Sequence, residues 1–495
     1  MADAGKQGRS EGGGETLDLK VDAEVELVVD ALRRAVDARV GLDCSFADRE
    51  RATLAIANEA QRRLLERELQ AIVDAQGREL LINDVLYRVH SPGSRDYVSL
   101  CGPLLVSRST YRQAGVHNGP TVIPLELEAG LMEGATPAMA YRVALGYAKE
   151  HSRGLEEDLR ASHHVPPSRT RLETLSKRLG AKAGKEARRI EAFLRQSERL
   201  PEGATGISVG LDRTAVPMEE ARPEGDISKP PKKKRDKPYV RTPPSPVDVN
   251  YRMAYVGTFT ITDQYGDSIL GRRYAATPEQ GPDEILYGMM GDVRNALRRN
   301  PGLHVGLVQD GAPEMWKLVR SALAQASVPK WLEAIDRYHV NERIAKVLKV
   351  IEPNPEARTP QLRRWNEEFD CDDSTIDRIE QLIASAIQNQ PAHEDSTVLL
   401  DNATFIANNK DRMRYVSLRK ACLPVGSGAT EGACRYVIGD RTKQASRRWH
   451  EAGLAAALTL RGIYCSDRLP RFFTYLQRYY TAEIREAEWK VDSAA

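Results

Sequence analysis

Three acidic residues occupy sequence positions at which they could bind a metal or take part in catalysis. Asp212 lies inside the apolar stretch "GISVGLDRTAVPM", Asp310 follows the apolar run "HVGLVQ", and Glu431 begins a helical segment after the turn "PVGSGAT". A carboxylate inside an apolar strand is strongly disfavoured unless it has a partner. The other two have structural alternatives, because Asp310 begins a "DGAP" turn and an acid such as Glu431 stabilises the first turn of a helix. Together, three carboxylates suit Mg²⁺, which prefers hard oxygen ligands.

The elements around these acids follow a recognisable order. From about residue 205 the apolar period changes from helical to strand-like, with a hairpin signal at "DQYGD" between two of the strands. The pattern then predicts a helix, the strand that ends at Asp310, a helix and a short strand before "DRYH". We therefore expect an α/β fold whose core is an RNase H-like mixed sheet flanked by helices. It would comprise residues 201–340 and 421–475, with a helical insertion at 341–420.

The region before the core is expected to be largely helical and to bind DNA. Residues 1–16 lack an apolar segment and predict a disordered tail, and residues 17–130 predict helices with a small β module. Residues 131–200 predict a helix-turn-helix-like region, in which Arg169 and Arg171 open the second helix and could reach DNA. The alternative is a solvated helix with basic faces. Residues 476–495 predict a C-terminal helix or tail.

Basic residues gather at two further places. The Pro- and Lys-rich stretch 219–248 predicts a flexible insertion that touches backbone phosphates or only solvent. After Glu431, helical spacing predicts that Arg435 and Ile438 share its face. Trp449 either packs on this helix or stacks on a base. The candidate DNA contacts here are Arg435, Arg441, Lys443, Arg447 and Arg448, and the alternative is again a solvated face.

Composition excludes several classes of protein. The 72 Lys and Arg nearly balance the 70 Asp and Glu, so any nucleic-acid surface must be local. No window is apolar enough for a membrane span, and the N-terminus does not read as a signal peptide. The 6 cysteines contain no Cys-x-x-Cys pair, which predicts reduced, mostly buried thiols in a cytoplasmic protein and no zinc ribbon.

Four segments resemble bacterial insertion-sequence DDE transposases, particularly the ISKra-like group. They are "VGLDRTAVPM", "VGLVQDGAPEMW", "IDRYHVNERI" and "GSGATEGACRYVIGDRTKQASRRWHEAGLAAALTLRGIY". The resemblance covers about residues 205–475. It implies that Asp212, Asp310 and Glu431 are the catalytic triad that holds Mg²⁺, with Mn²⁺ as a substitute.

The resemblance also bears on residues outside the triad. Asp336 and His339 match an acid-x-x-His signature of such transposases, in which His339 would contact or orient the cleaved strand. The alternative for His339 is a structural hydrogen bond. The Cys-x-x-Cys-like knuckle that members of the group often carry after the "TYR" strand is missing, so no zinc is expected.

A transposase of this kind would cleave the ends of an insertion sequence and join the released 3′-OH to target DNA. Its partners would be double-stranded DNA, as transposon ends and as target, and further copies of itself in a homodimer or larger synaptic assembly. It would be a cytoplasmic bacterial protein, nucleoid-associated when bound. Two alternatives keep the same fold: a domesticated, catalytically inactive DNA-binding protein, and an RNase H-like nuclease without strand transfer.

Overall fold

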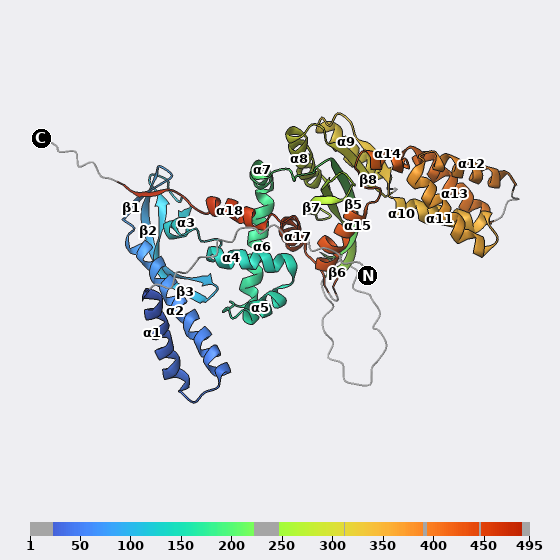
Figure 1. The fold of residues 1–495 in the computed structure, drawn as a ribbon. Helices are drawn as coiled ribbons and strands as arrows, with labels where there is room; N and C mark the ends of the chain where they lie inside the picture. The colour runs from blue at the N-terminus through green and yellow to red at the C-terminus, as the bar shows by residue number, and fades with distance from the viewer. Residues whose placement is uncertain (1–22, 222–246, 311, 390–393, 445–446, 488–495) are drawn as a thin grey trace, which may run out of the picture.

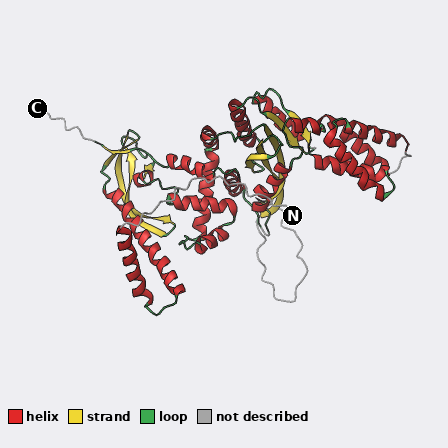
Figure 2. Cartoon of the chain, viewed as in Figure 1, coloured by secondary structure: helices red, strands yellow, loops and turns green. Residues whose placement is uncertain are grey.

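The computed structural model describes residues 23–221, 247–310, 312–389, 394–444 and 447–487. Within these ranges the chain is a mixed α/β protein with two five-stranded sheets, and helices lie between and beyond them (Figures 1 and 2). None of the helices in these ranges has the length and apolar character needed to cross a bilayer. The predicted tail at 1–16 and most of the predicted insertion at 219–248 lie outside the described residues.

The first sheet is antiparallel and lies beside a long helical hairpin. Its order is β10-β1-β2-β3-β4, and the predicted β module is confirmed. Asn83 and Asp84, with φ of 48° and 64°, make the tight turn between the first two strands. The elements are α1 (Ala23–Val40), α2 (Phe46–Asp74), β1 (Glu79–Ile82), β2 (Val85–Ser99), β3 (Gly102–Gln113), β4 (Thr121–Val122) and β10 (Ile484–Glu486).

The C-terminal segment differs from its prediction as helix or tail. Its last helix ends at Tyr479, and Ile484–Glu486 then forms β10, which pairs antiparallel with β1. Three residues are too few for a periodic pattern. The strand forms because β1 offers the backbone groups of an open sheet edge.

A helical region connects the two sheets. The predicted helix–turn–helix corresponds to α5 and α6, joined through residues 162–168. Both belong to one buried cluster with α4 and α17, so the late helix α17 completes the core of this earlier region. The helices are α3 (Pro124–Glu128), α4 (Pro137–Lys149), α5 (Ser152–Ala161), α6 (Arg169–Lys185), α7 (Ala187–Ser197), α17 (Glu451–Cys465) and α18 (Leu469–Tyr479).

The second sheet has the order β7-β6-β5-β8-β9. The first three strands in sequence pair antiparallel, and β8 and β9 then add in parallel beside β5. The predicted succession of strands and helices, including the hairpin at Asp263–Asp267, is confirmed. The elements are β5 (Gly206–Ala221), β6 (Val247–Thr262), β7 (Ser268–Ala276), α8 (Asp283–Arg299), β8 (His304–Gln309), α9 (Pro313–Gln325) and β9 (Leu332–Ile335).

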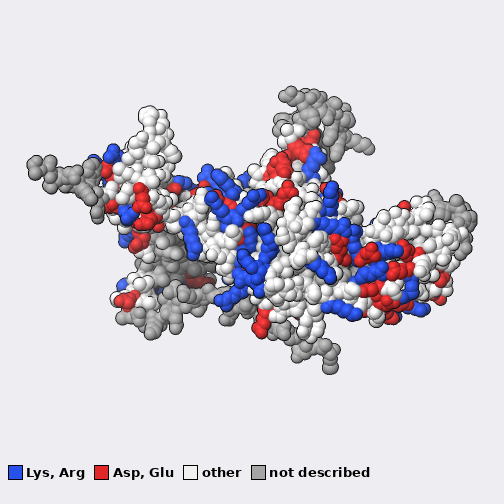
Figure 3. Space-filling view, turned by 90° about the horizontal axis from the view of Figure 1, so that it is seen from above, with Lys and Arg blue, Asp and Glu red and all other residues white. Residues whose placement is uncertain are grey.

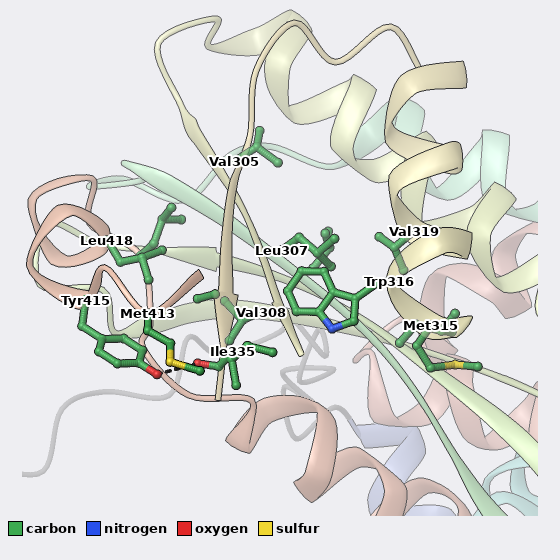
Figure 4. Close-up of a cluster of buried hydrophobic side chains, with 14 of the residues drawn as sticks. Val305, Leu307, Val308, Met315, Trp316, Val319, Ile335, Met413, Tyr415 and Leu418 are labelled. Carbon is green, nitrogen blue, oxygen red and sulfur yellow. Dashed lines mark hydrogen bonds between the residues drawn. The ribbon is translucent and has the colours of Figure 1, made fainter. Parts of the chain in front are cut away.

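Both faces of β8 are buried, as its continuous apolar run predicts. In Figure 4, Leu307 points toward Trp316 and Val319 of α9. Near the neighbouring edge strand, the Tyr415 hydroxyl donates a 3.1 Å hydrogen bond to the carbonyl of Ile335 (Figure 4). The helical block therefore packs directly against the sheet edge.

The predicted insertion at 341–420 is helical and begins slightly earlier, directly after β9. It extends away from the sheet (Figure 1) and returns the chain to the sheet at Leu423. Its helices are α10 (Arg337–Ile351), α11 (Pro355–Cys371), α12 (Thr375–Asn389), α13 (Glu394–Asn409) and α14 (Tyr415–Lys420). After it come α15 (Gly428–Ala433), a π-helical turn (Cys434–Gly439) and α16 (Asp440–Thr442).

The contact between α6 and α17 gives a stability prediction. A Cβ on Gly180 would lie 2.6 Å from both the Cβ and the carbonyl oxygen of Ala456, whereas a Cβ on Gly184 would lie 3.8 Å from its nearest neighbour. We expect Gly180→Ala to cost about 1–3 kcal/mol of unfolding free energy through overpacking. Gly184→Ala, on the same helix, should be neutral or stabilising by up to about 1 kcal/mol. Urea denaturation followed by circular dichroism measures both, and equal effects would contradict the close contact.

Candidate active site

Strand pairing sets Asp212 and Asp310 at the same level. β5 and β8 run parallel, from Gly206 opposite His304 to Val209 opposite Leu307. The same register continued by three residues sets Asp212 opposite Asp310. Beyond the paired stretch, the side-chain oxygen of Gln309 accepts a 3.4 Å hydrogen bond from the amide of Leu211. The strands thus stay together up to the two acids.

Glu431 is brought to these acids by a close contact between small residues. A Cβ on Gly210 would lie 2.2 Å from the Thr430 hydroxyl oxygen and 3.1 Å from the carbonyl oxygen of Val308. The Thr430 hydroxyl also lies 2.8 Å from that of Thr258 on β6. Only glycine at position 210 lets α15 approach the sheet this closely. Because Thr430 immediately precedes Glu431, this contact sets the third acid beside β5.

Asp212 is partly buried, and the charges of the other two acids act on it. Burial raises its pKa above the ordinary value, and the charges of Asp310 and Glu431 raise it further. The amide of Arg213 at 2.7 Å and the thiol of Cys434 at 3.2 Å donate hydrogen bonds to its carboxylate and oppose that rise. Among the described residues, the acids and histidines whose ligand atoms lie within 4.8 Å of one another are Asp336, His339 and Glu431, without Asp212 or Asp310. The grouping of Asp212, Asp310 and Glu431 as metal ligands therefore stays a prediction.

Asp336 joins two helix N-termini. It is buried, and its Oδ1 accepts hydrogen bonds from the amides of Tyr338 at 2.7 Å and His339 at 3.1 Å, which caps α10. Its Oδ2 accepts from the amide of Ser427, just before α15, and lies 2.9 Å from the Ser427 hydroxyl oxygen. That hydroxyl is also 2.7 Å from Glu431 Oε1, so its single proton serves one carboxylate at a time. Asp336 thereby fixes the start of the helix that carries Glu431.

His339 lies next to Glu431, with its Nε2 3.4 Å from Oε1 of that acid. Its other ring nitrogen is 3.4 Å from Glu342, and its side chain is 37% exposed. Asp336, His339 and Glu431 each offer a ligand atom within 4.8 Å of the others, so the three could hold a cation. Both oxygens of Asp336 already accept hydrogen bonds from amides, however. We therefore regard Asp336 as a positioning residue.

The helix after Glu431 contains a feature that the sequence analysis missed. Cys434–Gly439 form a π-helical turn, which changes the facing of every residue after it. The prediction that Ile438 shares the face of Glu431 is wrong, because Ile438 is buried whereas Glu431 and Arg435 are exposed. The side chain that faces Asp212 is instead Cys434, and burial raises the pKa of its thiol well above the usual range.

All six cysteines are free, as expected from their spacing. The expectation that they are mostly buried is wrong, since only Cys101 is fully buried and Cys371 is exposed. The Cys434 contact could have been found from spacing, because Cys434 lies three residues after Glu431 on the same side of a helix.

The prediction that Arg441 contacts DNA is wrong, because this side chain is buried. It is 1% exposed, donates a 3.0 Å hydrogen bond from Nε to the carbonyl of Tyr147, and lies 4.8 Å from the ring centres of Tyr147 and Trp449. Burial lowers its pKa to about 10. Arg447, half-buried, donates to the carbonyl of Arg441. Arg441 thus joins α16 to α4, Arg447 joins the segment after α16 to Arg441, and Trp449 packs against the core.

The other residues predicted to contact DNA differ in whether their side chains already have a partner within the protein. Arg171 donates a 2.6 Å hydrogen bond to the carbonyl of Asp96, and Arg448 pairs with Glu219. Lys443 is exposed and donates a 2.6 Å hydrogen bond to Thr214, two residues after Asp212. Arg169 and Arg435 are exposed and, within the described ranges, have no hydrogen-bond or ion-pair partner. Contact of these residues with DNA stays a prediction.

Comparison of the chain with models of known protein families gives no match, and comparison with curated proteins gives none either. The functional argument therefore rests on the geometry above.

The role of Asp336 can be tested by its stability cost. Asp336→Ala removes a helix cap and leaves the buried amide of Ser427 without its acceptor, so we expect a loss of about 3 kcal/mol or more. Asn354→Ala removes the exposed cap of α11, whose side chain accepts from the Glu356 amide at 3.0 Å, and should cost about 1 kcal/mol. Urea unfolding followed by tryptophan fluorescence compares the two. Equal losses would mean that Asp336 is only a cap.

Proposed function

We propose that the protein is a DDE transposase with an RNase H-like core, which cleaves the ends of an insertion sequence and joins them to target DNA. The observation that carries this proposal is the strand register that sets Asp212 level with Asp310, together with the contact between Gly210 and Thr430 that brings Glu431 to β5. Two of these acids come from neighbouring parallel strands, and the third comes from a helix that follows a long helical insertion.

The strand order supports an RNase H-like core. Three consecutive antiparallel strands are followed by two strands that add in parallel on the other side of the first, giving β7-β6-β5-β8-β9. Helices α8 and α9 connect these strands, as the alternation in the sequence predicts. The strand order supports the proposed fold only. The proposed reaction depends on the three acids.

The carboxylates fit Mg²⁺, with Mn²⁺ as a substitute. Asp212, Asp310 and Glu431 provide hard oxygen ligands, and a cation would relieve the repulsion that raises the pKa of Asp212. Divalent ions at such a site make an attacking oxygen more nucleophilic and stabilise the leaving oxygen of a phosphodiester. No zinc site is proposed.

Other residues of the protein position Glu431 and can contact the DNA. Asp336 and Ser427 hold the start of α15, and the close contact at Gly210 fixes its distance from β5. His339, half-exposed beside Glu431, can contact the cleaved strand, and Lys443 and Arg435 can bind neighbouring phosphates. In the first step water attacks the phosphorus and the bond to the 3′ oxygen breaks. In the second, the released 3′-OH attacks a phosphorus of target DNA, and the bond from that phosphorus to the 3′ oxygen of the target strand breaks.

The products of the reaction test this proposal. Wild type with Mg²⁺ or Mn²⁺ and a plasmid carrying the native flanking DNA should give cleaved element ends joined to new DNA. Asp310→Asn, which keeps the shape and removes a charge, should lower the rate roughly 100-fold or more. Asp283→Asn, an exposed acid in the first turn of α8, is the matched control and should keep full activity.

Each alternative product identifies a different function. Cleaved ends without joining would identify a nuclease, and end binding without cleavage under either metal would identify an inactive DNA-binding protein. Equal activity of Asp310→Asn and wild type would remove Asp310 from the site.

Metal removal gives a second test. In EDTA the ionised, partly buried Asp212 destabilises the fold, because the native state binds its proton more tightly than the unfolded state does. Stability from this group therefore falls as pH rises from the ordinary pKa of 3.8 through the raised value. At pH 7 without metal, Asp212→Asn should melt at a higher temperature than wild type. Added Mg²⁺ should raise the melting temperature of wild type alone; the same rise in the variant would place the cation elsewhere.

A further inference from the structure

Five exposed arginines lie on or beside α7, α8 and α18. Figure 3 shows Lys and Arg side chains gathered over the middle of one face of the molecule. Within the described residues, none of the five has an acidic group within ion-pair distance. We call this set the basic surface, and its members are Arg199, Arg298, Arg299, Arg471 and Arg478.

Contacts to the end of α7 hold the basic surface together. Arg299, from α8, lies 3.5 Å from the carbonyl of Gln196, and Arg471, from α18, donates a 3.1 Å hydrogen bond to the Ser197 hydroxyl. Arg199 follows α7 directly and lines the same small pocket as Arg299. Arginines from α8, α18 and the residues after α7 thus lie around the end of α7.

The other two members are placed by single contacts. The guanidinium of Arg478 lies 5.2 Å from the ring centre of Phe193, on α7. Arg298 donates a 2.7 Å hydrogen bond to Asn295, whose side chain in turn reaches the carbonyl of Arg195. Neither contact neutralises the charge.

The acids beneath this surface are already paired. Arg468, 2% exposed, contacts Glu191 at 3.0 Å, Glu198 at 2.7 Å and Asp292 at 3.1 Å. One exposed acid, Glu202, follows in the loop before β5. The five arginines therefore keep a net positive charge at the protein surface.

Exposed arginines elsewhere on the chain commonly do have acidic partners. Arg252 pairs with Glu220 on the adjacent strand, and Arg378 pairs with both Glu368 and Asp372. Grouping five like charges without such partners costs electrostatic free energy in the isolated protein. An anionic partner would recover that cost.

The basic surface is separate from the candidate active site. It adjoins the loop that leads into β5 at Gly206, and Asp212 stands six residues along that strand. At the rise of an extended strand, this separation is about 20 Å. A phosphate bound at the basic surface is therefore not the one that is cleaved.

We propose that the basic surface binds the backbone of double-stranded DNA that flanks the cleavage site. This proposal rests on the proposed function and adds a second contact to it. Guanidinium groups bind phosphate oxygens in pairs of hydrogen bonds, and a row of them suits a regularly spaced polyanion without reading its sequence. The surface therefore supplies affinity and orientation, and sequence is read elsewhere.

The experiment compares two triple variants of the full chain. Arg199→Gln, Arg299→Gln and Arg471→Gln together remove three charges from the basic surface. Lys346→Gln, Lys349→Gln and Arg363→Gln remove three exposed, unpaired charges from α10 and α11, within the described residues. Fluorescence anisotropy with a duplex of about 30 base pairs of arbitrary sequence, in EDTA, gives Kd across a range of salt concentrations.

We expect the first variant to bind at least about tenfold more weakly and its salt slope to shrink by about 2 to 3 units. The control should bind like wild type, and both variants should keep the wild-type melting temperature. Unchanged affinity and slope in the first variant, an equal loss in both variants, or no duplex binding by wild type would each overturn the proposal.

The outcome is separable from that of the proposed function. If wild type cleaves and joins DNA while the first variant binds normally, the transposase proposal stands and the basic surface does not bind DNA. If wild type binds through the basic surface but never cleaves, the surface proposal stands and the transposase proposal fails.

Discussion

The geometry of the candidate site depends on one close contact, between the backbone of Gly210 and the side chain of Thr430. Two of the three acids need only the sheet, because parallel pairing sets them level. The third comes from a helix more than 200 residues later in the chain than Asp212, and a single methyl group at Gly210 would keep that helix away. Asp336 supports the same helix from the other side through Ser427. The position of Glu431 thus depends on the absence of a side chain at Gly210 and on the hydrogen bonds of the buried Asp336.

Much of this arrangement could be predicted from the sequence, because it depends on local patterns. Apolar runs located β5 and β8 and therefore Asp212 and Asp310, and the turn before Glu431 located α15. The strand succession followed from periodicity, and the hairpin at Asp263–Asp267 from its turn residues. In each case the residues that carry the signal are the ones that form the element.

The errors share a different cause. Arg441 looked like a surface cation because its burial depends on Tyr147, which lies almost 300 residues earlier in the chain. The π-helical turn Cys434–Gly439 lies between Glu431 and Ile438, so regular helical spacing gives the wrong face for Ile438. The strand β10 exists only because β1 has a free edge. Contacts between distant segments decide these features, and no local pattern reports them.

The pairing of β10 with β1 has a consequence for how the chain can be divided. Leu80 and Glu486 are backbone partners, and α17 completes the buried cluster of the helical region. A fragment that ends near residue 200 would lack one strand of its sheet and two helices of its core, α17 and α18. The regions before and after β5 are therefore interlocked parts of one folding unit, and a cut between them would leave neither half complete.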